Sequence, residues 1–240
     1  MLIPRKNIVS ARKQGFLIGF VFQMIALALP AQSPAPIQGW WQIFLKHKTE
    51  KGWLWEADGG YRVHSTHFEP NVALARIGFG RQFKHFSVVA GGAWFESWPK
   101  AQNKPGNAEF RMHQKCTLPQ KLGSVGLTHT FRIEERWFQQ STLRNEFDFR
   151  LRLRYQLQAN YTLQNLRLLK AKPYFNGHSE IFASPNEGPF NQFRLYGGIG
   201  LNWEAHYRIE MGYLAIWLRS TVTGQIHPAQ ALRMNFFIHL

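Results

Sequence analysis

The sequence predicts an all-β protein, a single antiparallel up-and-down transmembrane β-barrel of about ten to twelve strands. Three observations favour this fold. Apolar and polar side chains alternate along many segments, which gives an extended chain one apolar and one polar face. Aromatic residues make up 15% of the chain, with nine Trp and twenty Phe. No long apolar segment follows residue 31, so a membrane protein with this sequence would cross with strands, because only helices and closed barrels satisfy their backbone groups in lipid.

The alternation is clearest in residues 144–158. Six large apolar side chains fall on one face of this segment: Phe147, Phe149, Leu151, Leu153, Tyr155 and Leu157. Six polar ones fall on the other: Glu146, Asp148, Arg150, Arg152, Arg154 and Gln156. A soluble sandwich also alternates, but it rarely opposes two such uniform stripes. A membrane barrel strand needs this contrast, since one face meets lipid and the other meets the lumen.

The N-terminus predicts a secretory signal peptide over residues 1–31, followed by an outer-membrane β-barrel domain over residues 32–240. Four cations, Arg5, Lys6, Arg12 and Lys13, precede an apolar run over residues 16–29, and Ala31 offers a small residue for cleavage. About fourteen apolar residues are too few for a spanning helix. An uncleaved N-terminal anchor is the alternative.

The positive net charge of the chain predicts which kinds of molecule the protein contacts. Removing residues 1–31 removes four cations and no acids, which lowers the formal charge from +15 to +11. The cations are dispersed along the predicted strands, a pattern that favours outer-membrane lipid, lipopolysaccharide or a small anionic solute over nucleic acid. The C-terminal segment, residues 232–240, alternates to its end at Leu240, which predicts recognition by the barrel-assembly machinery.

Turn-forming residues divide residues 39–240 into eleven alternating segments. The first, residues 39–46, ends at the turn K-T-E-K-G. The second, residues 53–64, sets one apolar face, Trp53, Trp55, Ala57, Gly59, Tyr61 and Val63, against Glu56, Asp58, Arg62 and His64. The third and fourth, residues 72–83 and 86–98, form a hairpin around Lys84 and His85.

A polar loop over residues 99–107 separates this hairpin from the next pair, residues 110–118 and 125–138, which a tight turn joins near Leu122 and Gly123. The remaining segments are residues 144–158, 170–184, 193–203, 207–217 and 232–240. The predicted inward face of residues 170–184 begins at Lys170 and Lys172 and continues through Tyr174, Asn176, His178 and Glu180. In residues 193–217 it comprises Arg194, Tyr196, Asn202, Arg208, Glu210 and Gly212.

Eleven segments conflict with the even strand number usual in bacterial barrels. With a periplasmic C-terminus, the first strand would also begin outside the cell. We therefore expect ten to twelve strands. The tryptophans fall near the two sets of strand ends, which predicts two interfacial girdles. One comprises Trp94, Trp98, Trp137 and Trp217, and the other comprises Trp53, Trp55 and Trp203.

The polar faces of consecutive strands predict a network of charges in the lumen, since opposite charges on neighbouring strands can pair. The candidate residues are Arg132, Glu134, Arg136, Glu146, Asp148, Arg150, Arg152, Arg154, Lys172, Glu180, Arg194, Arg208 and Glu210. One interpretation is a lumen sealed by ion pairs and hydrogen bonds. The other is a narrow pore or solute site that prefers anions.

Catalysis has weaker support. The chain offers histidines (His64, His85, His113, His129, His178, His206 and His239) and serines (Ser87, Ser97, Ser124, Ser141 and Ser179), but no nucleophile elbow or zinc motif. His178 and Ser179 would point to opposite faces, as would His113 and Cys116, the single cysteine. The glycine pairs 59–60, 91–92 and 197–198 indicate strand bending or close backbone approach. The sequence therefore predicts no catalytic residue, metal or cofactor.

Several motifs resemble the domain-of-unknown-function 2490 family. They are H-T-F-R-I-E-E-R-W-F (residues 129–138), R-N-E-F-D-F-R-L-R-L-R-Y (144–155), G-H-S-E-I-F (177–182), F-N-Q-F-R-L-Y-G-G-I-G (190–200) and R-I-E-M-G-Y-L (208–214). The resemblance covers residues 32–240 and is best from Thr128 onward; His178-Ser179 stands where the family commonly has Asn. It implies an outer-membrane β-barrel of Gram-negative bacteria and assigns no reaction or substrate.

Together these observations lead us to expect an integral outer-membrane barrel that is structural or forms a narrow, anion-leaning passive pore. Two alternatives stay open: a barrel enzyme that acts on lipid, and a soluble periplasmic lipocalin-like binding barrel. The soluble barrel would reverse the faces, with charges outward and aromatic side chains inside.

Overall fold

A computed structural model describes residues 36–64, 69–98, 106–139, 147–185, 188–203, 206–220 and 223–240. The chain divides into two units, residues 1–34 and 35–240, and all described residues belong to the second. The predicted signal peptide and Glu146 lie outside the described residues. The described part of the chain offers no helix with the length and apolarity that a membrane crossing requires.

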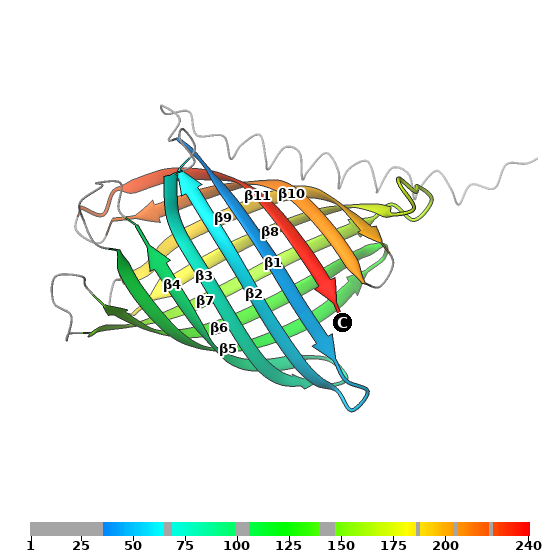
Figure 1. The fold of residues 1–240 in the computed structure, drawn as a ribbon, viewed down its shortest axis with the longest axis horizontal. Helices are drawn as coiled ribbons and strands as arrows, with labels where there is room; N and C mark the ends of the chain where they lie inside the picture. The colour runs from blue at the N-terminus through cyan, green and yellow to red at the C-terminus, as the bar shows by residue number, and fades with distance from the viewer. Residues whose placement is uncertain are drawn as a thin grey trace, which may run out of the picture. The chain divides into compact units, whose positions relative to one another are not determined.

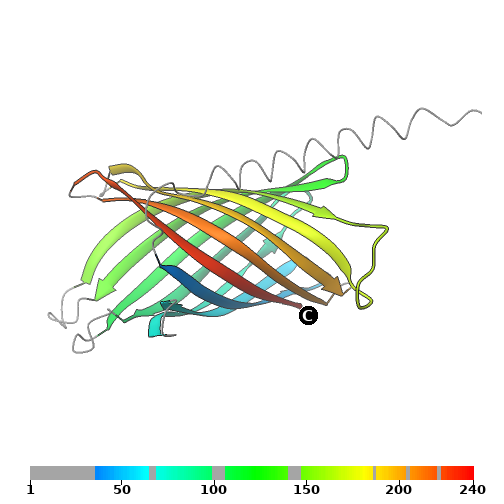
Figure 2. The same cartoon turned by 90° about the horizontal axis from the view of Figure 1, so that it is seen from above.

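Eleven strands form one closed barrel (Figures 1 and 2). They are β1 (Ile37–Lys48), β2 (Trp53–His64), β3 (Glu69–Gln82), β4 (Ser87–Ser97), β5 (Asn107–Leu122), β6 (Val125–Gln139), β7 (Phe147–Thr162), β8 (Lys172–Ser184), β9 (Gly188–Trp203), β10 (Tyr207–Arg219) and β11 (Ile226–His239). Each of the eleven predicted segments corresponds to one strand. The all-β, up-and-down barrel is therefore confirmed.

The barrel closes between its first and last strands. Consecutive strands pair antiparallel, whereas β1 and β11 pair parallel over ten residue pairs, from Ile37 with Gln230 to Lys46 with His239. Figure 1 shows their two arrows side by side and pointing the same way. The expected range of ten to twelve strands includes the observed eleven, and the even number usual in bacterial barrels does not hold here, because a parallel seam closes an odd-stranded meander without leaving an edge.

The odd number places the start of β1 and the C-terminus at opposite ends of the barrel. We call one end the C-terminal rim, formed by Lys48, Gln82, Leu122 and His239, and the other the opposite rim, formed by Ile37, Ser97, Gln139 and Arg219. At the C-terminal rim a two-residue turn joins β5 to β6, and its Gly123 has a φ of 59°. Glycine adopts this left-handed conformation without steric cost, which allows so tight a hairpin.

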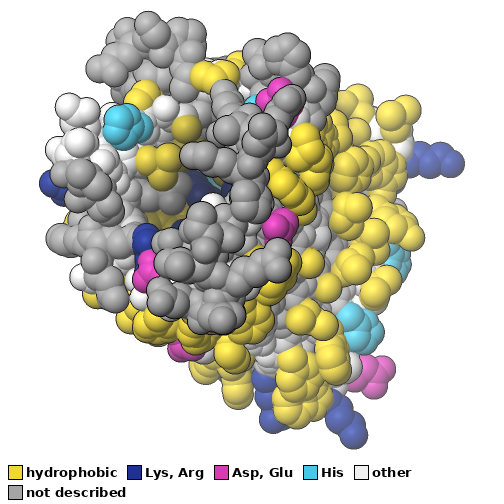
Figure 3. All heavy atoms as spheres, turned by 60° about the vertical axis from the view of Figure 1, so that its left-hand side comes forward, with side chains coloured by type: hydrophobic (Ala, Val, Ile, Leu, Met, Phe, Trp, Pro, Cys, Tyr) yellow, Lys and Arg dark blue, Asp and Glu magenta, His cyan; other side chains and the backbone are white. Residues whose placement is uncertain are grey.

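Large apolar side chains face outward from every strand. Each strand carries at least one that is more than a third exposed: Ile43, Trp55, Ile77, Trp94, Met112, Phe131, Leu153, Ile181, Ile199, Met211 and Leu232. We call this set the apolar belt. Figure 3 shows hydrophobic side chains over the visible barrel wall, with charged ones toward its far end. Glu135 is an exception, a half-buried outward carboxylate whose strand neighbours are Met112 and Leu151.

Val63 stays on the outward face of β2, opposite Gly39 of β1, although it is buried, because the register shift beside it places the extra residue in β3. One predicted position is wrong. Lys170 does not belong to a strand, because β8 begins at Lys172 and Lys170 lies in a turn with a φ of 64°. The tryptophan positions are confirmed: Trp94, Trp98, Trp137 and Trp217 lie near the opposite rim, and Trp53, Trp55 and Trp203 lie near the C-terminal rim.

Candidate functional site: the charged lumen

The strand register brings most of the chain's charges into the lumen. Apart from exposed rim residues such as Lys48 and Lys121, the inward positions carry fourteen cations: Lys46, Arg62, Arg76, Arg111, Lys115, Arg132, Arg136, Arg150, Arg152, Arg154, Lys172, Arg194, Arg208 and Arg233. They carry seven carboxylates: Glu56, Asp58, Glu109, Glu134, Asp148, Glu180 and Glu210. The described lumen therefore holds twice as many cations as carboxylates.

Glu134 lies at the centre of the charges on β5, β6 and β7. It pairs directly with Arg152 in the sheet register and accepts a 2.8 Å hydrogen bond from the Arg152 Nε. Arg132 and Arg111 approach its carboxylate to 3.5 Å and 3.8 Å. On the inward face of β6 and β7, the residue pairs before and after Glu134–Arg152 are pairs of like charge, for example Arg132 with Arg154. Such pairs repel, so Glu134 offsets repulsion between cations of three strands.

Glu109 plays the same part nearer the opposite rim. Arg111 donates to both of its carboxylate oxygens at 2.6 Å, and the Arg136 Nε donates to one of them. Sequence reasoning missed Glu109, Arg111 and Lys115, although they alternate along β5 in the same way as the predicted polar faces.

Glu180 and Glu210 hold together the lumen face of β7 to β11. Glu180 pairs with Arg154, and Arg194 lies 3.6 Å from its carboxylate. Glu210, by contrast, accepts hydrogen bonds from four neutral side chains: Tyr174 at 3.0 Å, Asn176 at 2.8 Å, Tyr196 at 2.8 Å and Asn235 at 3.2 Å. Both carboxylates are buried. Buried charges need this degree of hydrogen bonding to be tolerated.

Glycines make room for the two tyrosines that bind Glu210. A Cβ atom on Gly198 or Gly212 would lie within 2.5 Å of the Tyr196 hydroxyl oxygen, and one on Gly200 would lie 2.5 Å from the Tyr174 ring. The predicted role of the 197–198 glycine pair in close approach is confirmed at Gly198.

One ion pair bridges strands that are not neighbours. Lys115 on β5 binds Glu56 on β2, across the width of β3 and β4. Glu56 also lies 3.4 Å from Lys46, and Asp58 accepts hydrogen bonds of 2.9 Å and 3.0 Å from the Arg76 Nε. The network is therefore not confined to pairs of neighbouring strands.

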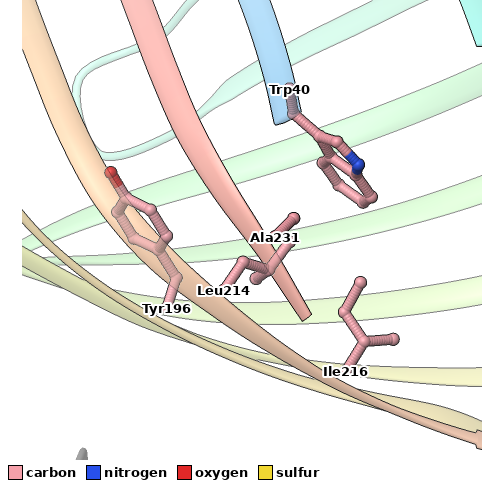
Figure 4. Close-up of a cluster of buried hydrophobic side chains, with 5 residues drawn as sticks. All are labelled: Trp40, Tyr196, Leu214, Ile216 and Ala231. Atoms are coloured by element: carbon pink, nitrogen blue, oxygen red, sulfur yellow. The ribbon is translucent and has the colours of Figure 1, made fainter. Parts of the chain in front are cut away.

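Buried apolar and aromatic side chains lie in the half of the lumen nearer the opposite rim. Five come from β1, β9, β10 and β11 and are seen together in Figure 4: Trp40, Tyr196, Leu214, Ile216 and Ala231. Four others are Leu74, Ala93 and Phe95 from β3 and β4, and Phe182 from β8. We call these nine residues the plug. Trp40 is 8% exposed, and Phe182 and Leu214 are not exposed at all.

Arginines stack on the plug and complete it. The Arg62 guanidinium lies 3.9 Å from the Trp40 ring centre, and that of Arg111 lies 3.5 Å from the Phe95 ring centre. Arg194 lies over Phe182 at 4.7 Å. A cation is attracted more strongly to the face of an aromatic ring when water is excluded from the contact. Guanidinium groups therefore cover the aromatic members of the plug.

A cavity of about 310 Å³ occupies the other half of the lumen. It reaches the C-terminal rim, since Lys46, Arg208 and His239 line it and lie within two residues of strand ends. Its further polar lining includes Glu56, Asp58, Arg76, His113, Lys115, Thr117, Thr128, Thr130, Arg132, Gln156 and Gln158. We call it the rim cavity.

The predicted network residues thus separate into groups. Arg132, Glu134, Arg136, Arg152, Arg154, Glu180, Arg194 and Glu210 belong to the buried network, and Arg208 lines the rim cavity. Asp148 and Arg150 form a more exposed pair near the opposite rim, with a contact of 2.6 Å. Lys172 is the first residue of β8, at the C-terminal rim.

The described histidines and serines assemble no catalytic pair that these contacts reveal. His178 lies 3.5 Å from Glu180 and stacks on Tyr196, while Ser179 faces the other side of the strand. His129 faces outward and contacts the Tyr155 hydroxyl at 2.9 Å. Among the described residues, no three His, Cys, Asp or Glu side chains are grouped to hold a metal ion.

Comparison with curated proteins gives no match. The family model described as protein of unknown function (DUF2490) matches residues 37–227, which run from the first residue of β1 to the second residue of β11. That match covers most of the chain and nearly all of the barrel, and the chain accordingly belongs to the DUF2490 family.

Proposed function

We propose that this protein is an integral outer-membrane β-barrel of a Gram-negative bacterium, with a lumen that the plug closes to ions. The apolar belt on a closed barrel with a charged interior carries this proposal. All eleven strands expose a large apolar side chain on the outer wall, while ion pairs and hydrogen bonds occupy the lumen. Water disfavours so large an apolar outer wall, whereas a bilayer favours it, and the closed barrel keeps the charged lumen groups away from lipid.

The same distribution argues against the soluble alternative. A soluble binding barrel has its charges outward and its apolar side chains around a cavity. Here Ile77 and Ile199 are more than 60% exposed, while Glu134, Glu180 and Glu210 are at most 3% exposed. So large an apolar outer surface on a monomer in water would favour aggregation.

The plug favours a closed lumen over an open pore. A water-filled passage leaves its lining accessible to water, whereas the plug residues are at most 8% exposed. Selectivity by charge requires a passage in the first place. The excess of lumen cations favours an anion pore as the second candidate, and conductance measurements distinguish the two.

The test uses residues 32–240 refolded in detergent and in lipid vesicles. We expect a mobility on gels that changes on heating, resistance to extraction without detergent, and no discrete conductance steps in a planar bilayer. A chain that stays in the aqueous phase contradicts the membrane proposal. An inserted chain with discrete steps in which anions carry most of the current establishes the pore instead.

A further inference from the structure

We propose that the rim cavity binds a small phosphorylated solute through Arg132 and Arg208. This inference rests on the proposed function, because it assigns a ligand to the open half of a barrel that is closed at the other end. Four observations support it: the charge of the cavity wall, two buried guanidinium nitrogens that lack partners among the described residues, neutral donors in the same wall, and the size of the cavity.

Cations outnumber carboxylates in the wall. Five cations line the cavity, Lys46, Arg76, Lys115, Arg132 and Arg208, against two carboxylates, Glu56 and Asp58. The protein itself already uses both carboxylates: Glu56 pairs with Lys46 and Lys115, and Asp58 pairs with Arg76. A surplus of positive charge therefore faces the cavity without a counter-ion from its lining.

The surplus lies on Arg132 and Arg208. The Nε atoms of both are buried and find no hydrogen-bond partner within the part of the chain that the structure describes. The Arg132 Nη1 lies 3.5 Å from the Glu134 carboxylate. For Arg208 the described residues provide ring contacts, 4.5 Å to Phe237 and 5.7 Å to Tyr174, and no ion pair. Burying guanidinium N–H groups without acceptors costs free energy. An anion that accepted hydrogen bonds from them in the cavity would offset this cost.

Neutral donors line the same cavity, on β6 with Arg132 and on the two strands that flank it. Thr117, Thr130 and Gln156 lie in one row across β5, β6 and β7, and Thr128 and Gln158 lie in another. Hydroxyl and amide groups can each donate to an oxyanion. An arginine fork matches the oxygens of a phosphate in a bidentate manner. The wall therefore offers charge and hydrogen bonds of the kind that a phosphate group needs.

The size favours a phosphate group with a small organic part. About 310 Å³ is at the lower end of the range for ligand pockets, and it exceeds the space that one phosphate ion fills. Phe44 and Phe237 also line the cavity, with ring centres 4.8 Å apart and nearly parallel planes. An apolar wall of this kind would contact the carbon atoms of the ligand.

The experiment measures phosphate binding by the refolded barrel. Titration calorimetry with inorganic phosphate and with glycerol phosphate is performed at constant ionic strength, with chloride as the competing anion. We expect saturable binding of both, tighter for glycerol phosphate, and at least tenfold weaker binding by Arg208→Met and Arg132→Met. Arg150→Met is the matched control, because Arg150 is an arginine near the opposite rim, and it should leave the affinity unchanged.

Two further measurements keep the proposal falsifiable. Lys46→Gln changes a half-exposed rim cation that a folded barrel tolerates, and it should weaken binding severalfold even if an arginine variant fails to fold. Barrels in nanodiscs of zwitterionic and of anionic lipid distinguish the sources of the phosphate group. Equal affinities assign the cavity to a free solute, whereas competition from anionic lipid that Arg208→Met abolishes assigns it to a lipid headgroup and overturns the proposed solute.

The outcomes separate this inference from the proposed function. A barrel that inserts, is silent in the bilayer and shows no saturable phosphate binding contradicts the inference alone. Binding that is equal in wild type, Arg208→Met and Arg132→Met contradicts it as well. A chain that does not insert contradicts the proposed function, whatever it binds.

Discussion

Single carboxylates decide whether the crowded cations of the lumen are tolerated, and Glu134 is the clearest case. It lies within 4 Å of arginines on β5, β6 and β7. Replacing it by Gln removes the charge and keeps the shape, which leaves three buried guanidinium groups facing one another. Breaking a buried ion pair from one side costs about 3–5 kcal/mol, and we expect a loss of this size for Glu134→Gln.

Urea unfolding in lipid vesicles, followed by tryptophan fluorescence, measures this loss. Asp148→Asn is the control, since Asp148 and its partner Arg150 are about 40% exposed, and an exposed pair contributes at most about 1 kcal/mol. Equal losses for the two variants would show that Glu134 does not neutralise the cluster.

The outer wall supplies a second prediction at this scale. Ile133 is exposed near the middle of β6, and Leu122 is exposed at the C-terminal end of β5. If lipid surrounds the belt, Ile133→Arg should destabilise the barrel by about 2–4 kcal/mol and Leu122→Arg by at most about 1 kcal/mol, because the cost of a charge depends on its depth in the bilayer. The same unfolding measurement compares them. Similar costs at both positions would argue that no apolar medium covers Ile133.

Sequence alternation predicted the faces of the strand residues that it assigned, because a strand has only two faces. It failed at Lys170, which precedes β8 and lies in a turn. It also could not foresee that Lys115 pairs with Glu56, since that contact depends on the curvature of three intervening strand pairs. Periodicity thus identifies lumen residues but not their partners across the lumen.

At the scale of elements, the parallel pairing of β1 with β11 determines the topology. It explains why eleven predicted segments did not need to be merged or divided. The even-number expectation assumes antiparallel closure, and nothing local in β1 or β11 distinguishes the two forms of closure. Strand number was therefore predictable from the turns, whereas the direction of the closing pair needed the register.

A disulfide tests this closure. Ile43 and Phe236 are outward-facing register partners in β1 and β11, and neighbouring strands are about 4.8 Å apart, within reach of a disulfide. In a Cys116→Ser background, Ile43→Cys with Phe236→Cys should cross-link on oxidation and shift the unfolded chain on a non-reducing gel. The control pairs Ile43→Cys with Met211→Cys on β10, one strand further away. Cross-linking of the control but not of the test pair would disprove the closure.

For the whole molecule, the unequal rims predict an orientation for the proposed membrane barrel. The C-terminal rim has short connections such as residues 49–52, 83–86 and 123–124, as periplasmic ends of barrels do. A membrane-impermeant maleimide should therefore label Thr223→Cys on intact cells, and Lys84→Cys only after the outer membrane is permeabilised. The background is Cys116→Ser. The reverse labelling pattern would indicate the opposite orientation, with the rim cavity open to the outside of the cell.

The division of the lumen into plug and rim cavity yields the last prediction. Trp40 and Phe95 belong to separate apolar clusters of the plug, and each carries a stacked arginine. Replacing both by Ala removes two large rings, so water can enter between the remaining side chains. Because cations outnumber carboxylates along the lumen, the passage should conduct anions in preference to cations.

Single-channel recording in a planar bilayer checks this, with Trp41→Ala and Trp94→Ala as the matched double variant. These residues are the chain neighbours of Trp40 and Phe95 and face outward, so their loss should leave the barrel silent. Discrete anion-biased steps in the Trp40 and Phe95 variant alone would locate the closure in the plug. Silence of both variants would mean that the ion-pair network closes the lumen without the rings, and conduction by both would mean that loss of aromatic side chains loosens the whole wall.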